Sequence, residues 1–143
     1  MDSLTPVEFQ TSMNFPFTMG IYLAVNTIPD AYLVMDEPNC VFFKAEHVYK
    51  NHDLFSTLLS AHGYHRISQT GLNSADVSLD HDPKIKHALR SRANHPGCNL
   101  VLLCSLPMVS ITGVQYDLII REVQTEKLGA PILEIPSRSL TMD

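Results

Sequence analysis

The sequence predicts an α/β fold in a single domain, with an open, mostly parallel sheet of about four strands and helices on both faces. Short apolar runs alternate along the chain with longer segments of helical periodicity, which is typical of a parallel sheet and its covering helices. Two of the runs, residues 32–35 and 100–104, are apolar throughout, as strands buried on both faces are. The 143 residues suffice for one domain with its own core.

The first half of the chain is expected to supply an arm, two helices and two strands. Residues 1–17 read as an N-terminal arm, and the α/β domain is expected to span residues 18–143. Thr18 is a suitable N-cap for the first helix. The expected elements then follow in the order helix 19–28, strand 32–35, helix 41–62 with a possible interruption at 51–53, and strand 64–68.

The second half is expected to complete the sheet. Residues 69–82 are polar and rich in turn formers, so we expect an irregular stretch there. Pro83 suits the first turn of a helix, and Gly129 suits the cap that ends a later one. The expected elements are helix 83–94, strand 99–104, helix 109–128 and strand 131–135. Strands that alternate with helices in this way predict a Rossmann- or flavodoxin-like sheet.

Composition excludes several classes of function. Fifteen acidic against ten basic residues give a formal charge of −5, whereas a nucleic-acid-binding surface needs clustered Lys and Arg. No apolar run reaches the length of a membrane span, and the N-terminus lacks the basic-then-apolar pattern of a signal peptide. We therefore expect a cytoplasmic protein that binds neither nucleic acid nor membrane.

Two of the three cysteines stand where a strand gives way to a helix. Cys40 follows the strand 32–35 after a turn, and Cys104 ends the strand 99–104. The carboxyl ends of strands in an open α/β sheet are where ligands bind, and a nearby helix start favours a thiolate. Two copies of the chain could supply the four thiolates of an iron–sulfur cluster. The alternative is that each cysteine is a small buried apolar residue, and for Cys98 this is the preferred interpretation.

Other site motifs are missing. The seven histidines form no HExxH pattern, and the chain has no GxSxG elbow, no GxGxxG loop and no P-loop. Asp36 or Glu37 could serve as an acid or as an oxygen ligand beside Cys40, although a loop carboxylate is ordinarily only solvated. The cysteine corners therefore remain the main candidates.

Four segments together resemble the first domain of the nitrogenase component 1 family. That family includes the nitrogenase molybdenum–iron subunits, the light-independent protochlorophyllide and chlorophyllide reductases, and the reductase of coenzyme F430 biosynthesis. Cys40 matches the family's corner cysteine and Cys104 its later strand-end cysteine, while Gly113 and Asp117 loosely match a Gly-Asp helix start. The segments are FTMGIYLAVNTIPDAYLVMDEPNC, SQTGLNSADVSLDHDPKIKHAL, NLVLLCSLPMVSITGVQYDLI and APILEIPSRSL.

The resemblance implies an oxidoreductase or electron-transfer module. It implies a [4Fe–4S] cluster at a subunit interface, held by Cys40 and Cys104 in a homodimer or in a heterodimer with a similar subunit, with Asp36 as a candidate carboxylate ligand. It also implies an ATP-dependent iron–sulfur reductase as the electron donor. The family's first cluster cysteine would fall near residues 14–16, where this chain has none, and family subunits are roughly three such domains long.

Two alternatives belong to other functional classes. One is a protein-interaction or scaffold domain that has the same fold and no cluster, which the missing first cysteine and the glycine-free MDEPNC corner favour. The other is a flavodoxin-like domain that binds a nucleotide or flavin in the crevice at the strand ends, which the missing Gly-rich loop disfavours.

Overall fold

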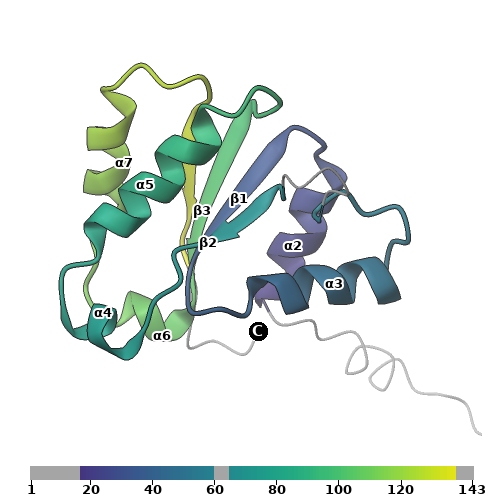
Figure 1. Cartoon of the computed structure of the whole chain (residues 1–143), viewed down its shortest axis with the longest axis horizontal. Coiled ribbons are helices and arrows are strands. Elements are labelled where there is room, and N and C mark those ends of the chain that lie inside the picture. The colour runs from purple at the N-terminus through teal and green to yellow at the C-terminus, as the bar shows by residue number, and fades with distance from the viewer. Residues whose placement is uncertain (1–16, 60–64, 138–143) are drawn as a thin grey trace, which may run out of the picture.

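A computed structural model describes residues 17–59 and 65–137 of the chain. Figure 1 shows a sheet in the centre with helices on both sides. The strands are β1 (Ala31–Asp36), β2 (Ile67–Gln69), β3 (Leu100–Ser105) and β4 (Ile132–Ile135). The helices are α2 (Phe17–Thr27), α3 (Val41–Asn51), α4 (Ser74–Ser78), α5 (Asp82–Ala93), α6 (Pro107–Ser110) and α7 (Tyr116–Gln124).

The sheet has the strand order β2-β1-β3-β4, and all its neighbouring strands are parallel. β1 and β3 are the central pair, in a register that places Met35 beside Cys104 and Asp36 beside Ser105. The predicted α/β class, with a parallel sheet of about four strands and helices on both faces, is confirmed. The expected arm at residues 1–17 lies outside the described residues except for Phe17, which begins α2.

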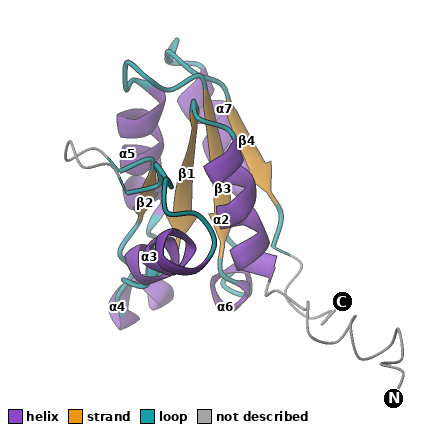
Figure 2. Ribbon diagram, turned by 90° about the vertical axis from the view of Figure 1, so that its right-hand side faces the viewer, coloured by secondary structure: helices purple, strands orange, loops and turns teal. Residues whose placement is uncertain are grey.

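Alternation along the central strands divides the core into two layers. Tyr32 and Val34 of β1 pack on the side of α5 and α7, whereas Leu33 and Met35 pack on the side of α2 and α3. Figure 2 shows these helix pairs on opposite faces of the sheet. The same alternation continues past the strand ends and decides which polar side chains can meet.

The helix predicted over residues 41–62 ends early, at Asn51. The Asp53 carboxylate accepts hydrogen bonds from the Phe55 backbone N–H at 2.9 Å and from the Asn26 side chain at 2.8 Å. A short polar side chain that bonds to nearby backbone competes with helical bonding, so the polar group at 51–53 ends the helix instead of only interrupting it.

The segment 109–128 also departs from the predicted single helix. α6 ends after one turn, where the Thr112 hydroxyl donates to the Val109 carbonyl at 2.7 Å. Gly113 follows with φ of 80°, a left-handed conformation that favours glycine and directs the chain away from the helix axis. α7 then begins at Tyr116. The expected irregular stretch at 69–82 contains α4, whose start has a capping box formed by Asn73 and Asp76.

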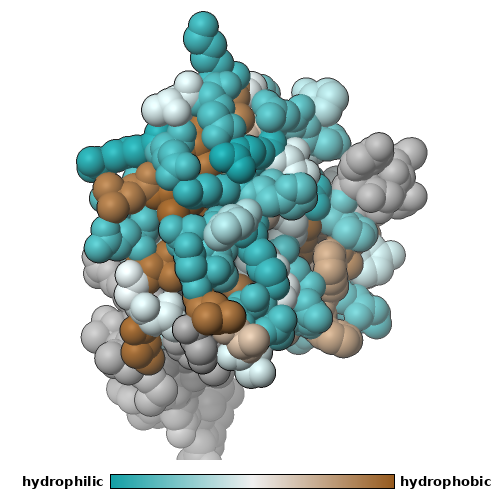
Figure 3. Space-filling model, turned by 60° about the vertical axis from the view of Figure 1, so that its left-hand side comes forward, coloured by the Kyte–Doolittle hydropathy of each residue, from teal (hydrophilic) through white to brown (hydrophobic). Residues whose placement is uncertain are grey.

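The outer surface of α5 and α7 is mainly hydrophilic. Lys86 binds Glu122 at 2.7 Å, and Arg90 binds Glu126 through two hydrogen bonds of 2.6 and 2.7 Å. Figure 3 shows this side of the molecule as mostly hydrophilic with separate apolar patches. Within the described residues, no helix combines the length and the apolar character needed to cross a membrane.

Candidate functional site

The carboxyl ends of β1 and β3 form the topological switch point of the sheet. The chain leaves β1 toward β2 on one side, and it leaves β3 toward β4 on the other. In open α/β sheets, ligands bind in the crevice that such a reversal opens. Two acidic residues, Asp36 and Glu37, lie at this edge, and both are fully buried at 0% exposure.

On the α5/α7 face, the Asp36 carboxylate accepts three hydrogen bonds from side chains. Tyr116 donates its hydroxyl to Oδ2 at 2.6 Å, and the Nε2 atom of His81 lies 3.1 Å from the same oxygen. Thr70 donates its hydroxyl to Oδ1 at 2.6 Å. Both oxygens of this buried carboxylate are therefore satisfied by side-chain donors. Burial, and the adjacent Asp36 charge, raise the pKa of Tyr116, so this hydroxyl remains a donor.

On the α2/α3 face, Glu37 joins a cysteine and a lysine. Its Oε2 atom accepts from Nζ of Lys44 at 2.8 Å, and its Oε1 atom accepts from the Cys40 thiol at 3.2 Å. Lys44 Nζ also lies 5.9 Å from the centre of the Tyr22 ring, in a cation–π contact. Within the described residues Lys44 is the one cationic partner of the buried Glu37 carboxylate, and the Lys44 side chain is 23% exposed.

Both candidate thiols are protonated in the free chain. Burial and the hydrogen bond to Glu37 raise the pKa of Cys40, and burial raises the pKa of Cys104 to about 12. Cys40 is half-buried, whereas Cys104 is only 1% exposed. The sequence predicted that the helix start would favour a thiolate at these corners. Desolvation and the Glu37 charge outweigh that effect.

Tyr22 is a buried polar group on the same face. Its side chain is 0% exposed, and its hydroxyl has no hydrogen-bond partner in the described part of the chain. Burial raises the pKa of Tyr22, and repulsion from Glu37 and, once they ionise, from Cys40 and Cys104 raises it further, so this hydroxyl lies within electrostatic range of both cysteines. A buried hydroxyl without a partner is costly, and it marks a place where a bound group could accept a hydrogen bond.

The predicted site residues divide between the two faces. Cys40 and Cys104 lie on the α2/α3 face, and the charge of Glu37 acts on both. Asp36 lies on the opposite face, where its oxygens are occupied by Tyr116, Thr70 and His81. Cys98 precedes β3, is 4% exposed and donates to the Leu100 carbonyl at 3.4 Å. No group of three or more His, Cys, Asp or Glu side chains in residues 17–59 and 65–137 could hold a metal ion within one chain.

Sequence reasoning did not find Tyr22, Lys44, His81 or Tyr116. Lys44 follows Glu37 by seven residues and Cys40 by four, so helical spacing after the corner could have indicated a lysine facing both. Tyr22, His81 and Tyr116 come from distant segments, and only the folded chain brings them to the strand ends.

A scan against models of protein families finds no match for this chain, and a search of curated protein sequences finds no match either.

Proposed function

We propose that the chain is an electron-transfer module of an oxidoreductase that resembles nitrogenase component 1. In this proposal a [4Fe–4S] cluster lies between two copies of the chain, or between this chain and a similar subunit, and each chain contributes Cys40 and Cys104. The main support is that Cys104, in the α2/α3 core near the end of β3, and Cys40, at the start of α3, both interact with Glu37 just beyond the end of β1. The strand-end position is where such sheets bind ligands.

Cysteine thiolates are the usual ligands of an iron–sulfur cluster, and Cys40 and Cys104 of one chain would supply two of the four that a [4Fe–4S] cluster needs. Two cysteines per chain require a second chain for four. Metal coordination removes the proton from a thiol even where burial holds it in the free protein. The unpartnered Tyr22 hydroxyl would gain an acceptor from a bound cluster, which removes the cost of leaving it unsatisfied.

We expect Glu37 and Lys44 to influence the cluster through their charges. In the cluster-free chain the Cys40 thiol donates to Glu37 at 3.2 Å. Binding of a cluster would remove that proton and break this hydrogen bond, and Lys44, which donates to Glu37 at 2.8 Å, would then help to balance the negative charges. Charges and hydrogen bonds near a cluster set its reduction potential. When bound, the cluster would supply one-electron transfer. By resemblance, the electrons would come from an ATP-dependent iron–sulfur reductase, and we propose a cytoplasmic location for both proteins.

The test is an anaerobic preparation of the wild-type chain and two single-cysteine variants. We expect a brown protein with equal amounts of iron and sulfide and the molar mass of a dimer. Cys40→Ala should lose colour and iron, whereas Cys98→Ala, at the opposite end of β3, should keep both. Equal iron content in the two variants would overturn the assignment of Cys40.

A second candidate is an interaction domain without a cluster. The observation that favours it is an exposed aromatic surface around α3, where Phe43 is 74% exposed and Phe55 is 90% exposed. A hollow of about 350 Å³ lies on this surface, lined by Phe42, Phe43, Glu46, Tyr49 and Leu59. Apolar surface of this kind marks protein-binding sites. Anaerobic protein that contains neither iron nor sulfide would favour this candidate over the cluster.

A further inference from the structure

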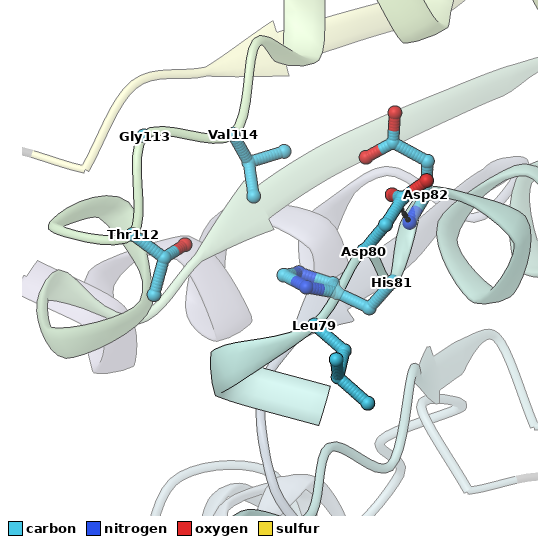
Figure 4. A pocket seen from close by; sticks show the side chains of 7 residues that line it. All are labelled: Leu79, Asp80, His81, Asp82, Thr112, Gly113 and Val114. Atoms are coloured by element: carbon cyan, nitrogen blue, oxygen red, sulfur yellow. Dashed lines mark hydrogen bonds between the residues drawn. The ribbon is translucent and has the colours of Figure 1, made fainter. Parts of the chain in front are cut away.

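A second pocket opens at the same edge of the sheet, on the α5/α7 face. It lies between the loop that leads into α5 and the loop that leads from α6 to α7 (Figure 4), and its volume is about 320 Å³. Volumes near 300 Å³ are at the small end of those that hold ligands. The lining residues are Leu79, Asp80, His81, Asp82, Thr112, Gly113 and Val114.

His81 is the buried polar residue of this pocket. Its side chain is 3% exposed, and its Nε2 atom is fixed by Asp36, which Tyr116 and Thr70 hold in turn. In the described part of the chain no hydrogen bond to its Nδ1 atom is found, and this nitrogen is not one of the fully buried unpaired atoms, so it faces the pocket. Figure 4 shows the ring extending from the Asp80–Asp82 segment toward the Thr112–Val114 segment. A buried imidazole held in one orientation, with one nitrogen unpartnered at a pocket wall, is available to a ligand.

The charge around the pocket is negative. Asp80 and Asp82 line it, Asp36 lies behind His81, and none of the seven lining residues is Lys or Arg. The two lysines of α5 are paired with carboxylates outside the pocket, since Lys84 binds Asp76 at 2.6 Å and Lys86 binds Glu122 at 2.7 Å. Lys86 also lies within electrostatic range of Asp82 and offsets part of its charge. Phosphate or carboxylate ligands would be repelled, which argues against a nucleotide, while a cation would be attracted.

We propose that this pocket binds a small organic cation with a primary ammonium group. The ammonium would lie near His81 and between the carboxylates of Asp80 and Asp82, and a short aliphatic portion would contact Val114 and Leu79. Three N–H donors on one cationic nitrogen match a wall made of carboxylate oxygens and an imidazole. This site does not depend on the iron–sulfur proposal, because it lies on the opposite face of the sheet.

The experiment is a titration of the whole chain with n-butylammonium chloride, followed by amide NMR shifts at constant ionic strength. We expect saturable shifts at His81, Thr112 and Gly113, and no saturation with n-butanol or sodium butyrate at equal concentration. Asp82→Asn removes one charge and keeps the shape of the side chain. It should weaken binding about tenfold, because a partly desolvated opposite charge is lost.

Asp117→Asn is the matched control. Asp117 also lies in the first turn of a helix, but it is exposed and lies outside the pocket. The affinity of the Asp117→Asn protein for n-butylammonium should therefore stay within about twofold of wild type. His81→Gln should weaken binding as well, and unchanged amide spectra elsewhere would show that this variant is folded. Saturation with butyrate, shifts without saturation, or an Asp82→Asn affinity equal to that of wild type would each overturn the proposal.

Discussion

At the carboxyl edge of the sheet, the adjacent acidic residues Asp36 and Glu37 lie on opposite faces and have different hydrogen-bond partners. On the α5/α7 face, both carboxylate oxygens of Asp36 are hydrogen-bonded, to the side chains of Tyr116, Thr70 and His81. On the α2/α3 face, Glu37 accepts from one lysine and one thiol, and the Tyr22 hydroxyl has no hydrogen-bond partner within residues 17–59 and 65–137. The first arrangement is complete in the single chain. The second leaves the Tyr22 hydroxyl without a partner in the described part of the chain, and a bound group that accepts from this hydroxyl could stabilise the folded state.

Removing the carboxylate from the completed network should have the largest effect. Asp36→Ala leaves the donors of Tyr116, Thr70 and His81 without their acceptor, and it should lower the free energy of unfolding by about 3–5 kcal/mol. Urea denaturation measures this change. Asp117→Ala, at an exposed carboxylate, should cost less than about 0.5 kcal/mol. A loss below about 1 kcal/mol for Asp36→Ala would show that the network adds little.

A matched pair of tyrosines sharpens the contrast between the faces. Tyr116→Phe removes a donor to a buried carboxylate and should cost about 1.5–3 kcal/mol. Tyr22→Phe removes a hydroxyl that has no partner among the residues the structure describes, so the free energy of unfolding should stay the same or rise by about 1 kcal/mol. Thermal or urea unfolding of the metal-free chain compares the two. Equal losses would mean that the Tyr22 hydroxyl has a partner in solution.

The α2/α3 face should also lose stability in alkali. The pKa of Cys104 rises from 9.0 in the unfolded chain to about 12 in the folded one, so its contribution is fully present below pH 9 and is lost as pH rises from 9 toward 12. At pH 10 the loss should be about 1.4 kcal/mol. Cys104→Ala should therefore show a shallower decline between pH 8 and 10 than wild type. Parallel declines would contradict the burial of the thiol.

Periodicity predicted the fold well because the central strands are apolar on both faces and the helices are amphipathic. β1 and β3 begin and end within about one residue of their predicted bounds, whereas α3 and α7 are shorter than expected. The Asp53 side chain bonds to nearby backbone after α3, and Gly113 adopts a left-handed conformation before α7. Helical periodicity of apolar residues detects neither effect.

The candidate site could be predicted only in part. The sequence predicted that Cys40 and Cys104 lie at one edge of the sheet. It offered Asp36 or Glu37 as the carboxylate beside Cys40, and the family resemblance selected Asp36. Consecutive residues at a strand end point to opposite faces, so Glu37, and not Asp36, lies beside Cys40. The hydrogen-bond partners of Asp36 are residues 70, 81 and 116. Because they are far from Asp36 in the sequence, no local sequence pattern indicates these contacts.

The most direct test of the cluster proposal compares two adjacent residues of β3 that face opposite sides of the sheet. Cys104 packs with the α2/α3 core, whereas Ser105 lies on the other face, within 3.4 Å of the Ser137 hydroxyl. We expect anaerobically prepared Ser105→Ala to retain about two iron atoms per chain, as one cluster shared by two chains requires, and Cys104→Ala to retain almost none. Equal iron content in the two variants would contradict the account.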